Sequence, residues 1–275
     1  MRLRIKSATA VVAACMAATS LFAPATALAQ ERNLVAFGDS VLANPNGNDY
    51  LSSRLGPEAS SVRNGLGCPQ SNNYARRAGA MMGMPVRDFS CSGTVTMSHG
   101  PHMRAQIDDA IRTGALTPAT ARVVYTVGFN DTYNNPRLNM QQIREQWVRA
   151  NVPLIQLIRN AAPNARIQIV GYPTIGDNGN YCLFNLGGSS SQAPIPLPQV
   201  QDWENKAQWM QVDLARATGV EFLDLKPATR HNGMCASDSQ RMWSGLVDFG
   251  AGTQYLPLHI NERGQQYVAG IVARS

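Results

Sequence analysis

The chain has 275 residues, of which 44% are hydrophobic, 7% aromatic and 15% charged. This is the composition of a globular protein, and the length is enough for one sizeable α/β domain without requiring a second. It excludes a disordered, fibrous or transmembrane chain. The formal net charge is +6, but the Lys and Arg residues do not form a run. The sequence therefore does not favour a nucleic-acid-binding protein.

The N-terminal segment has the pattern of a secretory signal peptide. It has a basic start, an Ala/Val-rich apolar run and a small-x-small cleavage site, namely Arg2, Arg4 and Lys6, then a run to about Phe22, then Ala27-Leu28-Ala29. We predict that residues 1–29 are removed and that residues 30–275 form a single domain. Removing three basic and no acidic residues lowers the formal charge to +3.

Two further features of this segment concern membranes. The apolar run is short for a spanning helix and is interrupted at Pro24, so we expect no stable membrane span. Val12-Ala13-Ala14-Cys15 resembles a lipoprotein cleavage box, which would leave a lipidated Cys15. The residues after Cys15 stay apolar, which suits a continuing signal peptide better than the start of a tether.

The remaining cysteines support export. They are even in number, and an exported chain with four cysteines is expected to form two disulfides. Of the three possible pairings we expect the two that close local loops, Cys68–Cys91 and Cys182–Cys235. The absence of a C-x-x-C pair in the sequence argues against a zinc site, so we expect no metal.

Five short apolar runs bounded by turn residues predict buried strands. They are Asn33–Gly38, Pro85–Ser90, Arg122–Gly128, Ala165–Gly171 and Val220–Asp224. Helical patterns separate them, and strands that alternate with helices predict an α/β fold with a parallel sheet covered on both faces. In such folds the active groups gather beyond the carboxyl ends of the strands.

Three helical patterns are clear. Val200, Trp203, Ala207, Met210 and Leu214 share one helical face. Ile143, Trp147, Leu154 and Ile158 predict a second helix, bent or broken at Pro153. Residues 262–273 predict a C-terminal helix with Tyr267, Val268, Ile271 and Val272 turned inward.

The first strand runs into Gly38-Asp39-Ser40. Glycine permits a tight turn there, and a serine at a helix start lies near backbone N–H groups that favour negative charge. A hydroxyl nucleophile whose attack creates an oxyanion needs that environment. The plainer interpretation is a strand-end turn with Asp39 or Ser40 as helix cap.

The second and third strands also run into candidate site residues, Gly93 and Asn130. A glycine lets its own N–H approach a ligand closely, and an asparagine carboxamide is a neutral donor. The N–H groups of Ser40 and Gly93 and the side chain of Asn130 would together form an oxyanion hole. Taken singly, Gly93 could be a turn glycine and Asn130 an Asx turn, but three such residues follow three successive predicted strands.

His259 precedes the predicted C-terminal helix. The chain has four histidines, His99, His102, His231 and His259. A general base for a serine is expected to be a histidine whose pKa lies near the working pH. By its order in the chain, His259 is the best placed of the four.

With these residues the chain resembles the SGNH (GDSL) hydrolases, whose four marker residues match Ser40, Gly93, Asn130 and His259 in order. The cysteine-bearing blocks, such as Cys68-Pro69-Gln70-Ser71, are similar to the secreted, disulfide-bearing bacterial branch. The resemblance implies a flavodoxin-like three-layer α/β/α sandwich. It also implies ester hydrolysis without metal or cofactor, with Ser40 attacking and His259 taking and returning its proton.

One departure from the family pattern concerns the residue that orients His259. Most members carry an Asp three residues before the His, where this chain has Leu256. Some members of the secreted branch use a main-chain carbonyl instead, so by resemblance the carbonyl of Leu256 would accept a hydrogen bond from His259 Nδ1. Asp248 and Glu262 are rival acids, and Pro257 would help to hold the local geometry.

We therefore expect a monomeric, secreted or cell-envelope serine esterase or lipase that forms an acyl-enzyme on Ser40. Its substrate would be a small-molecule, lipid or acylated-glycan ester. An acyltransferase of the cell envelope would share the first step, and a non-catalytic envelope-binding module on the same scaffold is the alternative from another class.

Overall fold

The computed structural model describes residues 31–55, 62–187, 193–252 and 255–275. Residues 31–275 belong to one compact unit. The predicted signal peptide and Cys15 lie outside the described residues. None of the described helices combines the length and apolar character needed to cross a membrane.

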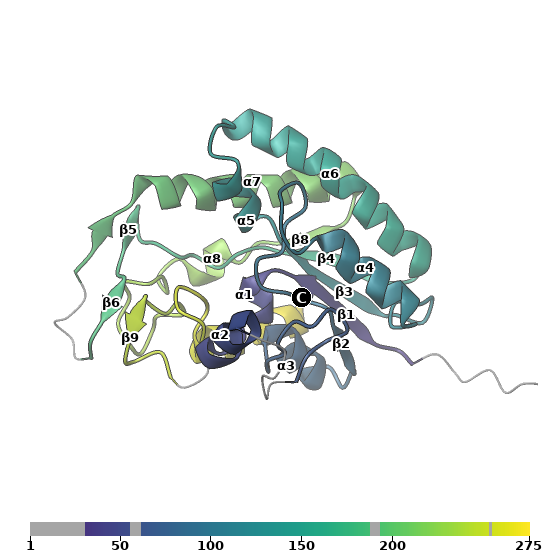
Figure 1. Cartoon of the computed structure of the whole chain (residues 1–275), viewed down its shortest axis with the longest axis horizontal. Coiled ribbons are helices and arrows are strands. Elements are labelled where there is room, and N and C mark those ends of the chain that lie inside the picture. The colour runs from purple at the N-terminus through teal and green to yellow at the C-terminus, as the bar shows by residue number, and fades with distance from the viewer. Residues whose placement is uncertain (1–30, 56–61, 188–192, 253–254) are drawn as a thin grey trace, which may run out of the picture. The chain divides into compact units, whose positions relative to one another are not determined.

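A five-stranded parallel sheet lies at the centre (Figure 1). Its strand order is β2-β1-β3-β4-β8, which is the flavodoxin-like order 2-1-3-4-5 when its own strands are counted along the chain. Each of the five predicted runs contains one strand, so the α/β prediction is confirmed. The strands are β1 (Leu34–Gly38), β2 (Val86–Asp88), β3 (Arg122–Thr126), β4 (Arg166–Val170) and β8 (Glu221–Leu223).

Alternation along β1 shows how the sheet is covered on both faces. Val35 and Phe37 pack into one apolar cluster, whereas Leu34 and Ala36 pack into another. The first cluster contains residues of α4 (Met103–Arg112), α6 (Met140–Ala161) and α7 (Pro198–Thr218). The second contains residues of α3 (Tyr74–Met81) and α9 (Glu262–Arg274). The two helical layers lie on opposite sides of the sheet, as the expected three-layer sandwich requires (Figure 1).

Two expectations about helices need correction, the break at Pro153 and the inward orientation of Tyr267. Helix α6 runs without a break through Pro153, because Ile143, Trp147 and Ile158 bury its inner face and outweigh a cost of about 3 kcal/mol for an internal proline. In α9, Val268 and Val272 are buried as expected, but Tyr267 is 41% exposed. Its ring lies at the helix edge, where the hydroxyl donates to the carbonyl of Ala228 at 3.2 Å.

The remaining elements are short. The helices are α1 (Ser40–Ala43), α2 (Gly47–Leu55), α5 (Phe129–Asn134) and α8 (Lys226–Thr229). Two small strand pairs, β5 (Asn180–Tyr181) with β7 (Ile195–Pro196) and β6 (Phe184–Asn185) with β9 (Val247–Asp248), lie between β4 and α9 in the chain.

Both predicted disulfides are present. Cys68 pairs with Cys91 and Cys182 with Cys235, with Cα atoms 5.4 and 5.0 Å apart. Each bridge closes a loop around the carboxyl end of the sheet and is expected to contribute about 2–4 kcal/mol to the free energy of unfolding.

The glycines of α9 give a matched test of this packing. A Cβ at Gly264 would lie 2.4 Å from the carbonyl oxygen of Met242 and 2.3 Å from Ile260 Cγ2, whereas at Gly270 it would meet only the flexible end of Arg274 at 3.1 Å. Gly264→Ala should therefore lower the free energy of unfolding by about 1–3 kcal/mol. Gly270→Ala should be neutral or stabilise by up to about 1 kcal/mol through helix propensity. Denaturant unfolding of both variants measures this, and an equal loss in both would contradict the packing.

Candidate active site

Ser40 is positioned by the tight passage from β1 into α1. The chain turns at Gly38, where a Cβ would lie 2.8 Å from Leu42 Cβ and 3.0 Å from the carbonyl oxygen of Thr126, so a side chain does not fit. Asp39 then caps the helix, because its side chain accepts a hydrogen bond from Val41 N at 2.9 Å. Ser40 is thereby the first helical residue, beyond the carboxyl end of β1.

His259 comes from 219 residues further along the chain and meets Ser40. Its Nε2 lies 2.7 Å from Ser40 Oγ. Its Nδ1 lies 2.8 Å from the carbonyl oxygen of Pro257. A carbonyl only accepts, so Nδ1 carries the proton, and Nε2 is left as the acceptor for the serine hydroxyl. The two side chains thus form the hydrogen bond that proton transfer requires.

The orienting carbonyl belongs to Pro257, and the prediction of Leu256 is wrong by one residue. The carbonyl of Leu256 is engaged elsewhere, because it accepts hydrogen bonds from His259 N at 3.1 Å and from Ser244 Oγ at 2.9 Å. This tight turn, with Leu258 at a φ of 64°, leaves the next carbonyl free to face the imidazole.

Neither rival acid contacts the imidazole. Asp248 is buried and forms a two-pronged ion pair with the buried guanidinium of Arg241. Glu262 lies in the first turn of α9 and pairs with Arg77 at 2.7 Å. Both carboxylates therefore hold structure around the site and do not orient His259.

The environment of His259 keeps its ring neutral. Burial disfavours the imidazolium and lowers the pKa of His259 to about 4, although the Pro257 carbonyl acts in the opposite direction. At neutral pH the ring is uncharged, which is the state that accepts a proton from a hydroxyl.

The three predicted oxyanion donors line the same pocket as this pair. Gly93 has a φ of 84°, a conformation that favours glycine, and within the described residues neither its N–H nor that of Ser40 meets a protein acceptor. The carboxamide of Asn130 is held from both ends: Nδ2 donates to the Thr94 carbonyl at 2.8 Å, and Oδ1 accepts from Tyr133 at 2.7 Å. One amide hydrogen of Asn130 remains for a ligand.

Asp131 is a site-supporting residue that the sequence did not reveal. Its fully buried carboxylate accepts hydrogen bonds from a loop and from a helix, the donors being Thr96 N, Thr96 Oγ1, Met97 N, Ser98 Oγ and Trp147 Nε1. It thereby ties the loop that carries Gly93 to α5, which carries Asn130. In the sequence, the Gly128-Phe129-Asn130-Asp131 block draws attention to Asp131, but the residues that donate to its carboxylate lie more than 15 residues away in the chain.

Asp39 lies directly beside Ser40 and is also buried. It accepts a hydrogen bond from the hydroxyl of Tyr172, which in turn accepts from Phe129 N at 3.1 Å. Desolvation raises the pKa of Asp39 to about 7, against the lowering effect of these hydrogen bonds. A carboxyl whose folded pKa is raised binds its proton more tightly than in the unfolded chain, so its contribution to stability decreases as the pH rises from about 4 to about 7.

The pocket around Ser40 and His259 has a volume of about 650 Å³. Its lining is mainly apolar and aromatic, and includes Phe129, Tyr181, Leu183, Trp203, Met234 and Trp243. Its polar lining residues include Ser40, Asn130 and His259, with Asp39 and Ser92 beside them in the chain. This is the ordinary composition of a small-molecule site, with an apolar body and a few convergent polar groups.

The fold and the residues gathered at its strand ends define the class as a carboxylic ester hydrolase of the SGNH type. The chain belongs to the GDSL-like lipase/acylhydrolase family, whose model matches residues 36–267. No curated protein is similar enough in sequence to count as a match.

Solved structures share the fold. An extracellular lipase from Streptomyces rimosus has a TM-score of 0.53 and 18% identity, with 88% of this chain and 99% of that chain covered. Phospholipase A1 from Streptomyces albidoflavus NA297 has a TM-score of 0.53 and 17% identity, with 87% and 98% covered. A carbohydrate esterase family 2 enzyme from Corynascus thermopiles has a TM-score of 0.52 and 13% identity, with 88% and 64% covered.

The low pKa of His259 predicts an unusual pH profile. A general base at His259 would act only as the neutral ring, so kcat/KM for a soluble ester should fall only as the pH drops through about 4. At pH 5 it should keep about 90% of its plateau, against about 3% for a histidine of pKa 6.5. Asp39→Asn should leave this acid limb in place. An acid limb centred near pH 6.5 in a protein that remains folded would contradict the assignment.

Proposed function

We propose that this protein is a serine esterase in which Ser40 is the nucleophile and His259 the general acid and base. The observation that carries the proposal is the 2.7 Å contact between Ser40 Oγ and an Nε2 left unprotonated by the Pro257 carbonyl. A hydroxyl and a base at that distance, open to a ligand-sized pocket, constitute an activated nucleophile.

In the first half-reaction, Ser40 Oγ bonds to the ester carbonyl carbon while His259 Nε2 takes its proton. The carbonyl oxygen becomes an oxyanion, to which the N–H groups of Ser40 and Gly93 and the amide of Asn130 donate. The bond from carbon to the alcohol oxygen then breaks, and His259 gives its proton to that oxygen. Water attacks the resulting acyl-enzyme while His259 takes a proton from it. The bond between Ser40 Oγ and the acyl carbon then breaks, His259 returns the proton to Ser40 Oγ, and the acid leaves.

The apolar body of the pocket supports an acyl group of hydrocarbon character. Burial of methylene groups stabilises binding by about 0.8 kcal/mol each. Among the described lining residues the one carboxyl group is that of Asp39, which already accepts hydrogen bonds from Val41 N and Tyr172. A lipid or another acyl ester therefore fits it better than a charged acid. The lipase and phospholipase A1 that share the fold agree with this class of substrate.

The alternatives share the scaffold. An acyltransferase would use the same acyl-enzyme and pass it to another hydroxyl, but no feature of the described pocket favours a second alcohol over water. A non-catalytic module has less support, because such a module does not need an assembled pair of Ser40 and His259 with a free set of oxyanion donors.

We also propose that the protein is exported and acts as a monomer. Two disulfides suit an oxidising compartment, and the N-terminal pattern is that of a signal peptide. Every residue of the proposed machinery comes from one chain, so a single copy suffices for activity.

A fluorophosphonate tests the nucleophile directly. Intact mass of residues 30–275 after treatment should show one adduct, because the reagent bonds covalently to an activated serine. Ser40→Ala should show none, and His259→Ala should react at least about 10³-fold more slowly because its base is missing. A folded wild type without an adduct, or an adduct that persists in Ser40→Ala, would refute the proposal.

A further inference from the structure

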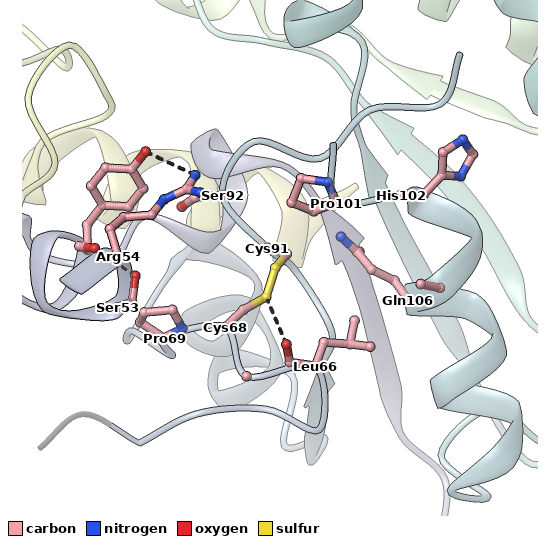
Figure 2. Close-up of a pocket in the computed structure, with 13 residues that line it drawn as sticks. Ser53, Arg54, Leu66, Cys68, Pro69, Cys91, Ser92, Pro101, His102 and Gln106 are labelled. Carbon is pink, nitrogen blue, oxygen red and sulfur yellow. Dashed lines mark hydrogen bonds between the residues drawn. A yellow bond between two sulfur atoms is a disulfide. The ribbon is translucent and has the colours of Figure 1, made fainter. Parts of the chain in front are cut away.

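A second pocket adjoins the catalytic pocket at the strip formed by Ser92 and Gly93. Its volume is about 300 Å³, and the Cys68–Cys91 disulfide and Pro101 form part of its wall (Figure 2). Tyr50 and Ser92 line both this pocket and the catalytic pocket. The two pockets therefore share Ser92, the chain neighbour of the proposed oxyanion donor Gly93.

Among the described residues that line the second pocket, Arg54 is the one arginine or lysine. Its guanidinium carbon lies 5.3 Å from the ring centre of Tyr50, and one of its nitrogens donates to the Tyr50 hydroxyl at 3.4 Å (Figure 2). The same nitrogen, Nη2, lies 3.8 Å from the position that a Cβ on Gly93 would occupy. In the part of the chain that the structure describes, no carboxylate lies within ion-pair distance of Arg54.

Ser92 adds an unpaired hydroxyl. Its Oγ is buried and has no hydrogen-bond partner among the described residues. A buried polar atom without a partner is costly, and a ligand oxygen would satisfy it. By contrast, the side-chain amide of Gln106 in the same wall is fully engaged with Gly38 and Thr94, so it shapes the pocket without offering a donor.

We propose that this second pocket binds the alcohol part of the ester and selects alcohols that carry a phosphate or carboxylate group. The inference rests on the proposed function. With the acyl chain in the apolar catalytic pocket and the carbonyl oxygen at Gly93, the alcohol part needs a separate space beyond the Ser92–Gly93 strip. Arg54 offers a planar fork of donors that matches an anionic oxygen pair, and the Ser92 hydroxyl lines the same pocket.

Matched esters with the same acyl chain distinguish a phosphate from a carboxylate as the preferred anionic group. The phosphate arm compares 1-octanoylglycerol 3-phosphate with 1-octanoylglycerol, and the carboxylate arm compares 3-octanoyloxypropanoate with its methyl ester at the acid end. All four are used below their micelle concentrations. The readout is the ratio of kcat/KM for release of octanoate from the anionic and the neutral ester.

We expect the wild type to prefer the anionic ester in at least one arm by about tenfold. This is the effect expected of a charge-assisted hydrogen bond, made weaker because Arg54 is exposed to solvent. Arg54→Gln should abolish this preference and Arg54→Lys should keep part of it. Glutamine has a helix propensity close to that of arginine, so α2 should persist. Arg149→Gln, which removes an equal charge from the exposed face of α6, should keep the whole preference.

The subsite and the proposed function are contradicted by different results. A wild type whose ratio of anionic to neutral kcat/KM is near 1 in both arms, a preference that survives Arg54→Gln, or an equal loss in Arg149→Gln would overturn the subsite. A folded wild type that hydrolyses none of the four esters would instead overturn the proposed function, and the inference would fall with it.

Discussion

The hydrogen bond between His259 Nδ1 and the carbonyl of Pro257 is the contact on which the proposed chemistry depends. It sets the tautomer of the ring, and the tautomer decides whether Nε2 can accept the proton of Ser40. The contact in turn depends on Ser244, whose buried side chain bonds the Leu256 carbonyl and turns it away from the ring. The buried pair of Arg241 and Asp248 anchors the same segment, since Asp248 also accepts from Gly245 N and Gly250 N.

Carboxylates thus take an unexpected part in this site. Asp131, Asp39 and Asp248 are buried around it, yet each bonds to backbone or to side chains that shape loops, and none bonds to the imidazole. In a serine–histidine–aspartate triad, loss of a working acid costs about 10⁴ in turnover. A neutral carbonyl fixes the ring equally well in direction but stabilises the imidazolium less. Burial of the ring, which the Pro257 carbonyl offsets only in part, lowers the pKa of His259.

The sequence predicted correctly those features that depend on residues close together in the chain. Apolar runs predicted all five sheet strands, and the rule that active groups follow strand ends brought Ser40, Gly93 and Asn130 to one edge. The sequence failed where the outcome depends on residues far apart in the chain. The choice of the Pro257 over the Leu256 carbonyl depends on Ser244 and on a positive φ at Leu258, and the anchoring role of Asp131 depends on Thr96, Ser98 and Trp147. The continuity of α6 at Pro153 likewise follows from tertiary burial, which overrides a local preference.

The proposed chemistry requires that the Pro257 carbonyl hold His259 as a neutral ring with its proton on Nδ1. Nitrogen NMR of the ¹⁵N-histidine-labelled protein tests it most directly, with His259→Ala assigning the signals. We expect a neutral ring between pH 5 and 8, protonated at Nδ1 and bare at Nε2. An imidazolium at pH 6, or a ring protonated at Nε2, would contradict it.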